Sequence, residues 1–191
     1  IEEIGGLPPL GTPMNAAVTG IVQGEGFRVE KIIFESRPQA YVTANLYVPD
    51  GVTGPTGAVL FLCGHFEHAK HAEEYHNVCL AIAQAGLVVL AQDPVGQGER
   101  LSYYDPALRE TTVPWGVAEH SYAGHQCLMA GESIARYFVH DAMRGIDYLC
   151  TRPEVDPDRI GVTGNSGGGT QTSLVMICDR RIAAAAPTTF I

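Results

Sequence analysis

One short stretch of the sequence has the residue types and spacing of a nucleophile. Gly164-Asn165-Ser166-Gly167-Gly168 follows the pattern Gly-x-Ser-x-Gly. This pattern places a serine at the tip of a sharp turn when a buried strand precedes it and a helix follows. Glycine at the outer positions leaves room for neighbouring backbone, and the N–H groups after the serine can face an oxyanion. The stretch therefore predicts acyl transfer through Ser166. The simpler alternative is a glycine-rich turn that only joins a strand to a helix.

The sequence around Ser166 supplies the elements that such a turn needs. Continuous apolar runs are typical of strands buried on both faces, and they predict strands over residues 58–63, 87–92, 159–163 and 183–186. Apolar residues at helical spacing predict helices over residues 72–85, 132–150 and 168–178. This alternation indicates right-handed crossovers and a mostly parallel, doubly wound sheet with helices on both faces. Ser166 then follows the third of these strands directly.

Two further strands and two irregular segments complete the expected α/β domain. Residues 41–48 alternate between polar and apolar, as in a half-buried strand, and with residues 27–35 they predict an antiparallel pair at one sheet edge. Residues 1–26 are rich in Gly and Pro and predict an irregular arm, so residues 27–191 form the N-terminal part of one domain. Residues 93–132 also lack a regular pattern, and loops of this length are usually functional.

The composition narrows the class of protein. Hydrophobic residues make up 46% of the chain and charged residues 17%, which is typical of a globular protein. The formal net charge of −9 argues against a nucleic-acid partner, and the apolar runs are too short to span a membrane. Five cysteines without a CxxC pair indicate reduced thiols rather than a zinc site of that type. With no leader pattern at the start, these features favour the cytoplasm.

The sequence does not match the residue spacing that cofactor-binding motifs and metal sites require. A phosphate-binding Walker loop needs Lys after its last glycine, and Thr170 stands there. A dinucleotide fingerprint would open the first strand–helix unit, whereas these glycines come late in the chain. His65, His68 and His71, with His76 beyond, suggest a metal site, but no carboxylate is placed as a clear fourth ligand. We therefore expect a polar loop here, and neither a metal nor a cofactor.

Two stretches of the sequence resemble one branch of a known superfamily. Residues 141–169 and the run Asp93-Pro94-Val95-Gly96-Gln97-Gly98-Glu99-Arg100 are similar to the acetyl xylan esterase and dienelactone hydrolase-like branch of the α/β hydrolases. Prolyl oligopeptidase catalytic domains share a looser version. The resemblance covers residues 27–191 and implies the α/β-hydrolase fold and an esterase.

The resemblance also implies roles for particular residues. The backbone N–H of His65, which follows Gly64, and the N–H of Gly167 would form the oxyanion hole. Cys63 departs from the histidine that is usual in that branch, which leaves the backbone donor in place. The catalytic acid and histidine follow the serine along the chain in this fold, so both are expected after Ile191.

Three explanations are open for the catalytic acid and base. The chain could be the N-terminal part of a split or cleaved enzyme that a second chain completes, or it could be a truncation. Alternatively, His120 or His125 could act in this chain with Asp141 nearby in sequence. We favour the first two explanations over the third. A strand over residues 183–186 would then be an exposed edge, and we expect a second polypeptide to pair there.

The sequence as a whole predicts a serine hydrolase that cleaves a carboxylic ester through an acyl-Ser166 intermediate. The resemblance favours an acetyl ester of a carbohydrate as substrate. The alternatives are a prolyl oligopeptidase-type peptidase and a non-catalytic binding module that keeps the turn. Trp115, Tyr122 and Asn165 are candidate substrate contacts, although aromatic residues in a long segment could equally pack the loop onto the sheet.

Overall fold

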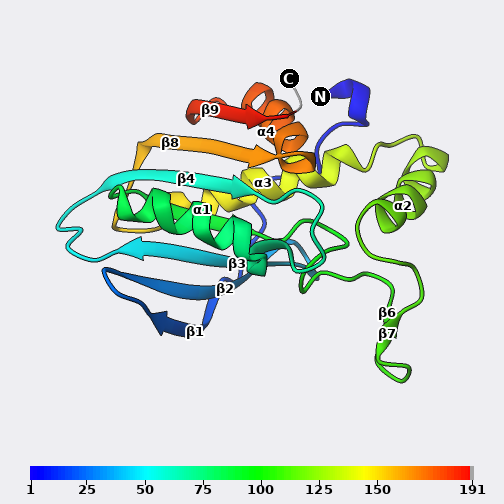
Figure 1. The fold of residues 1–191 in the computed structure, drawn as a ribbon. Coiled ribbons are helices and arrows are strands. Elements are labelled where there is room, and N and C mark those ends of the chain that lie inside the picture. The colour runs from blue at the N-terminus through cyan, green and yellow to red at the C-terminus, as the bar shows by residue number, and fades with distance from the viewer. Residues whose placement is uncertain (190–191) are drawn as a thin grey trace.

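The computed structural model describes residues 1–189 and is built around a seven-stranded sheet (Figure 1). Its strands lie side by side in the order β1-β2-β3-β5-β4-β8-β9. They are β1 (Ala17–Gln23), β2 (Phe27–Arg37), β3 (Ala40–Pro49), β4 (Thr56–Leu62), β5 (Val88–Gln92), β8 (Val155–Asn165) and β9 (Ile182–Thr188). The helices are α1 (Glu73–Gln84), α2 (Val117–Met129), α3 (Ala135–Cys150) and α4 (Gly167–Cys178), with 3-10 turns η1 (Glu2–Ile4) and η2 (Ala69–His71). A small hairpin of β6 (Tyr104–Asp105) and β7 (Glu110–Thr111) lies outside the sheet.

The strand directions divide the sheet into two halves. β1, β2, β3 and β5 pair antiparallel, and this half contains the predicted pair of β2 and β3. The pair was expected at the edge of the sheet, but β1 occupies the edge instead. β5, β4, β8 and β9 pair parallel, which confirms the predicted parallel ladder with helices between its strands. The carboxyl ends of parallel strands meet at one edge of a sheet. The segments that follow Leu62, Gln92 and Asn165 therefore come together there.

Helices cover both faces of the sheet, as the buried strand pattern predicts. Leu60 and Leu90 point to the face covered by α3 and α4, whereas Phe61 and Val89 point to the face covered by α1. These four side chains are at most 3% exposed, and each contributes about 2 kcal/mol by leaving water. Among the described residues, no helix is both long and apolar enough to cross a membrane.

The structure differs from the sequence prediction in two segments. Within the arm expected to be irregular, residues 1–26, Ala17–Gln23 form strand β1. Both faces of β1 are largely exposed, so its sequence lacks the apolar alternation that marks a half-buried strand. Within residues 93–132, Val117–Met129 form helix α2, whose only buried residue is Glu119. A helix without a buried apolar stripe gives no periodic signal.

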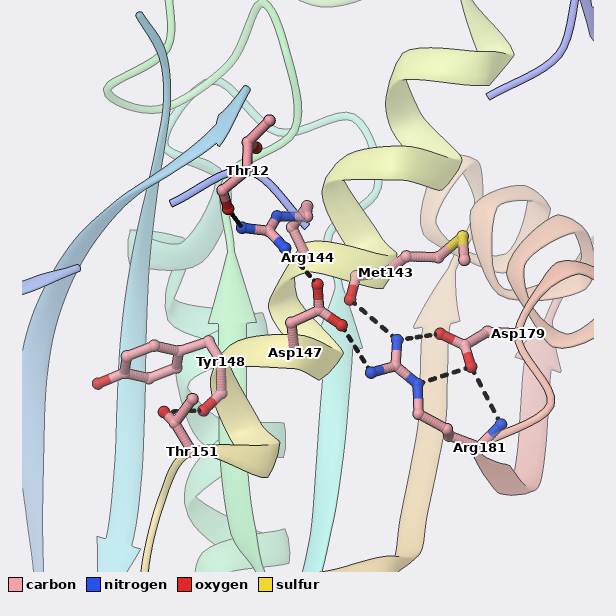
Figure 2. A network of polar contacts seen from close by, with 8 residues as sticks. All are labelled: Thr12, Met143, Arg144, Asp147, Tyr148, Thr151, Asp179 and Arg181. Atoms are coloured by element: carbon pink, nitrogen blue, oxygen red, sulfur yellow. Dashed lines mark hydrogen bonds and ion pairs between the residues drawn. The ribbon is translucent and has the colours of Figure 1, made fainter. Parts of the chain in front are cut away.

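A network of charged side chains ties the arm to the two helices behind the sheet (Figure 2). Arg144 of α3 donates to the carbonyl oxygen of Thr12 at 2.6 Å and pairs with Asp147. Arg181, which precedes β9, pairs with Asp147 at 2.6 Å and with Asp179 at 2.6 Å. Arg144 and Asp179 are buried, and buried charges are tolerated when they are paired in this way. The network therefore fixes α3 against the connection from α4 to β9.

Candidate active site

The turn at Ser166 has the backbone geometry that the sequence pattern predicts. β8 ends at Asn165 and α4 begins at Gly167, so a single residue joins strand to helix. Ser166 has φ 57° and ψ −121°, a conformation that costs a residue with a Cβ about 1–3 kcal/mol. The turn is held from β9, because the Ser166 N–H lies 3.1 Å from the carbonyl oxygen of Thr188 and 2.9 Å from Thr189 Oγ1.

The glycines around Ser166 are required by close backbone contacts. A Cβ on Gly168 would lie 1.9 Å from the carbonyl oxygen of Leu62 in β4, and a Cβ on Gly164 would lie 2.3 Å from the same atom. A Cβ on Gly169 would lie 2.3 Å from the carbonyl oxygen of Thr188. These separations are far below van der Waals contact, so the neighbouring strands pass where side chains would otherwise be. The glycine spacing is thus a steric requirement of the turn.

The structure brings Ser166 together with both residues expected to form the oxyanion hole. A Cβ on Gly64 would lie 3.2 Å from Ser166 Cβ, so the loop after β4 passes directly beside the turn. The imidazole of His65 lies against Gly167, where a Cβ would be 2.9 Å from His65 Cε1. Gly167 opens α4, and the first N–H groups of a helix have no partner within it. In the described chain, the N–H of His65 has no backbone acceptor either.

Two buried side chains that the sequence analysis did not single out hold the loop containing His65. Gln97 is 1% exposed, and its Nε2 donates to the carbonyl oxygens of Gly64 and Phe66 at 2.8 Å each. The N–H of Gly64 donates to the hydroxyl of Tyr75 at 2.9 Å. Burial raises the pKa of the Tyr75 hydroxyl, which keeps it protonated. The backbone of Gly64 and that of Phe66, on either side of His65, are therefore fixed.

A buried ion pair in turn fixes the loop that carries Gln97. Asp93, which follows β5, is fully buried and pairs with Lys70, itself 2% exposed. Asp93 Oδ2 also accepts from Thr43 Oγ1 at 2.7 Å and from the N–H of Glu99 at 3.2 Å. Gly98 has φ 59°, and a Cβ there would lie 2.5 Å from Asp93 Cγ. The Asp-x-x-Gly-x-Gly pattern therefore serves to wrap the loop around the Asp93 carboxylate.

A pocket of about 280 Å³ opens beside the turn. It is lined by Cys63, Gly64, His65, Gln97, His120, Ile134, Ala135, Phe138, Gly167, Thr170, Gln171 and Leu174. The pocket contains both expected oxyanion residues together with side chains of α3 and α4, and its wall is mostly apolar. A concave apolar site with a few polar groups is the usual form of a small-molecule site.

The three candidate substrate contacts lie in different surroundings. Trp115 and Tyr122 are partly exposed, at 37% and 52%, and neither lines the pocket. The ring of Tyr122 packs edge-on against Tyr103, with centroids 5.1 Å apart, which is packing within the loop. Asn165 lies next to the nucleophile position, and its Oδ1 accepts from Thr189 Oγ1 at 3.1 Å. Their contacts with a substrate remain predictions.

Among the described residues, neither histidine proposed as a catalytic base within this chain makes a hydrogen bond with Ser166. His120 contacts His65, with 3.1 Å between His120 Nδ1 and His65 Nε2, and His125 is exposed on α2. Asp141 is 2% exposed and pairs with Arg100 at 2.7 Å, not with a histidine. Within residues 1–189 the structure therefore assembles no Ser–His–acid triad from these groups.

The remaining histidines and the cysteines do not gather around one point. In the part of the chain that the structure describes, no three His, Cys, Asp or Glu side chains are close enough to hold a metal ion. His76 Nδ1 lies 2.9 Å from the hydroxyl of Tyr47 in β3.

Burial raises the pKa of the Cys63 thiol well above its ordinary value. Because the thiolate is the reactive form, the raised pKa makes Cys63 a poor nucleophile.

Comparison with known proteins adds a family and several related structures. A family described as acetyl xylan esterase (AXE1) matches residues 21–190. A candidate hydrolase, YtaP of Bacillus subtilis (strain 168), is 26% identical over 180 residues, which are 89% of this chain and 55% of that protein.

Related structures include a candidate acetyl xylan esterase from Bacteroides fragilis NCTC 9343, with 23% identity and a TM-score of 0.77 over 96% of this chain and 49% of that one. Acetyl xylan esterase from Paenibacillus sp. R4 also has 23% identity, with a TM-score of 0.66 over 92% of this chain and 54% of that one. These structures share the fold. The chain spans about half the length of the proteins that it matches.

Proposed function

The chain belongs to the acetyl xylan esterase (AXE1) family, and on that premise we propose that it carries the nucleophilic serine of a carboxylic ester hydrolase. The observation that carries the proposal is the strained turn at Ser166, with φ 57°, set beside the loop Gly64–His65 and the first residue of α4. Such strain persists only where the surrounding structure imposes it, and it occurs preferentially at active sites.

In the proposed reaction, Ser166 Oγ attacks the carbonyl carbon of the ester while a base takes the hydroxyl proton and later passes it to the leaving alcohol. The carbonyl oxygen becomes an oxyanion, which the backbone N–H groups of His65 and Gly167 stabilise. Collapse of this intermediate breaks the bond to the alcohol, which leaves with a proton, and forms an acyl-Ser166 ester. Water then attacks the acyl group and releases a carboxylic acid. Gln97 and Tyr75 hold the loop that contains His65 in place. The His65 N–H therefore needs no rearrangement during the reaction.

The catalytic acid and base in this proposal come from a polypeptide segment outside residues 1–191. A serine hydroxyl is a weak nucleophile without a base to take its proton, and among the described residues no such base contacts Ser166. The support is at the edge of the sheet. Among residues 1–189, β9 pairs with β8 alone, and residues 183–186 are exposed. Since exposed edges readily accept another strand, we propose that the missing segment pairs with β9, either from the same polypeptide or from a second one.

The proposed substrate is an acetyl ester of a carbohydrate, on the support of the family's description. A second candidate function, a binding module without catalysis, is favoured by one observation: among residues 1–189 no base contacts the Ser166 hydroxyl. The two candidates make opposite predictions for turnover by the intact protein.

The test is hydrolysis of 4-nitrophenyl acetate and of acetylated xylo-oligosaccharides by the intact protein. Ser166→Ala is expected to lower kcat/KM by a factor of about 10³ or more. Ser121→Ala, on the exposed side of α2, is the matched control and keeps the activity. Equal activity of Ser166→Ala and wild type would refute the proposed nucleophile. Hydrolysis of the nitrophenyl ester but not of the oligosaccharides would refute the carbohydrate substrate alone.

A further inference from the structure

His65 contributes a side chain to the pocket as well as a backbone donor, and that side chain belongs to a chain of hydrogen bonds. His65 Nε2 lies 3.1 Å from His120 Nδ1. His120 Nε2 lies 2.7 Å from the carbonyl oxygen of Val95. His65 comes from the loop after β4 and His120 from α2, so this contact joins α2 to the loop beside Ser166.

The partners determine where the protons lie. A carbonyl oxygen only accepts, so His120 Nε2 carries a proton and donates to Val95. Burial lowers the pKa of both imidazoles, and for His120 the neighbouring His65 lowers it further, which favours neutral rings. A neutral His120 then has a lone pair on Nδ1. His65 Nε2 must donate to it, which leaves His65 Nδ1 as a hydrogen-bond acceptor.

His65 Nδ1 faces Gly167, the residue after the proposed nucleophile. A Cβ on Gly167 would lie 3.0 Å from Nδ1 but 3.7 Å from Nε2, so the Nδ1 edge of the ring is turned towards Gly167. The nearest polar side chains of α4 are engaged elsewhere, because Gln171 Nε2 donates to the carbonyl oxygens of Cys63 and Gly167 and Thr170 Oγ1 donates to that of Ser166. Among the described residues, no donor reaches His65 Nδ1.

We propose that His65 Nδ1 binds a hydroxyl group of the substrate close to the reacting carbonyl, and that His120 is a positioning residue that keeps Nδ1 unprotonated. The ligand class is an ester with a free hydroxyl next to the ester group, on either its alcohol or its acyl part. The inference rests on the proposed function, because it assumes that Ser166 and Gly167 face the ester. His65 Nδ1 then favours esters with the hydroxyl over esters of the same shape without it.

The first test uses two pairs of esters of equal size with the intact protein. Ethylene glycol monoacetate and propyl acetate differ by a hydroxyl on the alcohol part, and ethyl glycolate and ethyl propanoate differ by one on the acyl part. His65→Phe is expected to lower the ratio of kcat/KM, hydroxylated over plain, by about ten-fold in one pair, since one hydrogen bond is lost. The pair that responds identifies the side of the ester. Unchanged ratios in both pairs would overturn the proposal.

Variants at position 120 test the positioning role. His120→Leu removes the acceptor for His65 Nε2, and the same ratio is expected to fall several-fold. His120→Asn places an amide oxygen near the position of Nδ1 and is expected to restore the ratio. His68→Phe, an exposed residue of the same loop, is the control and leaves the ratio unchanged. A His120→Asn variant that behaves like His120→Leu would contradict the role of hydrogen bonding.

A spectroscopic readout does not depend on hydrolysis. Nitrogen-15 spectra of the imidazoles are expected to show His65 protonated at Nε2 and unprotonated at Nδ1, with Nδ1 shifting when methyl β-D-xylopyranoside is added. Protonation at Nδ1, or no shift with the sugar at saturating concentration, would overturn the inference. If the protein hydrolyses none of the esters, the proposed function fails, whereas the spectra still decide the state of His65.

Discussion

The turn at Ser166 and the segment 101–133 flank the same pocket, yet they are held in place by different means. Around the turn, Gly164, Gly168 and Gly169 have backbone from β4 or β9 within 2.3 Å of where a Cβ would be. Between residues 101 and 133, only Gly116 and Glu119 are buried. The turn is fixed by contacts that leave no free volume, whereas the segment is fixed by a few polar contacts at its base. The turn is therefore a rigid wall of the pocket, and residues 101–133 form an adaptable wall.

This difference in packing fits the proposed function. Attack by a serine needs one geometry, which the sheet imposes from below, while the substrate varies between related enzymes and is contacted by loops above. The contact from His120 of α2 to His65 is the point at which the adaptable wall reaches the rigid one.

The largest effect is expected from adding one methyl group to the rigid wall. Gly168→Ala places a Cβ 1.9 Å from the carbonyl oxygen of Leu62, so β4 and α4 must separate. We expect a loss of at least about 3 kcal/mol in the free energy of unfolding, measured by urea denaturation. Gly131→Ala is the matched change after α2, where φ is +77° and nothing lies within 4 Å. It should cost about 1 kcal/mol through backbone strain alone. Equal costs would show that the two walls are not held differently.

A smaller effect is expected in the loop that carries His65, through which the turn and residues 101–133 meet. Gln97→Glu removes the Nε2 donor from the carbonyl oxygens of Gly64 and Phe66 and introduces a charge at a site that is 1% exposed. We expect a destabilisation of about 3 kcal/mol and, in the intact protein, a lower kcat with little change in KM. Thermal unfolding and steady-state kinetics measure both. Gln126→Glu, on the exposed side of α2, is the control. A Gln97→Glu variant with normal kcat would show that the position of the His65 loop does not affect catalysis.

The far end of α4 offers a pH-dependent test. Burial raises the pKa of Asp179, but its hydrogen bonds and ion pair with Arg181 outweigh this and lower the pKa below its ordinary value. A carboxylate with a depressed pKa stabilises the fold above its unfolded pKa of about 4, and this contribution is lost as the pH falls through the folded value.

Arg181→Ala should therefore cost about 2 kcal/mol at pH 7 and lose less stability than wild type on acidification below pH 4. Urea denaturation at several pH values checks this. Parallel loss of stability in the two proteins would contradict the assigned role of the pair shown in Figure 2.

The smallest expected effect is an increase in stability, and it concerns α2 in the adaptable wall. Gly124 lies within α2, and a Cβ there would make only an ordinary contact of 3.7 Å with Ile134. Gly124→Ala should stabilise the protein by about 0.5–1 kcal/mol, because alanine loses less backbone entropy in a helix. Thermal unfolding detects the shift. A destabilised variant would show that α2 is packed as tightly as the turn.

The same contrast explains what the sequence could predict. The glycine pattern around Ser166 marks positions where backbone of β4 or β9 leaves no room for a side chain, so the turn, its strand and its helix were predictable, as were the apolar strands β4 and β5. Helix α2 and strand β1 were not, because their exposed faces carry no apolar period. Gln97 and Tyr75 were missed because their partners are backbone groups of Gly64 and Phe66, which only the folded chain brings near.

The central claim is that Ser166 is the nucleophile, and covalent labelling tests it most directly. The intact protein is treated with a fluorophosphonate probe, digested and analysed by mass spectrometry. We predict one adduct, on the peptide that contains Ser166, and none in Ser166→Ala. An unlabelled wild-type protein, or labelling that persists in Ser166→Ala, would contradict the account.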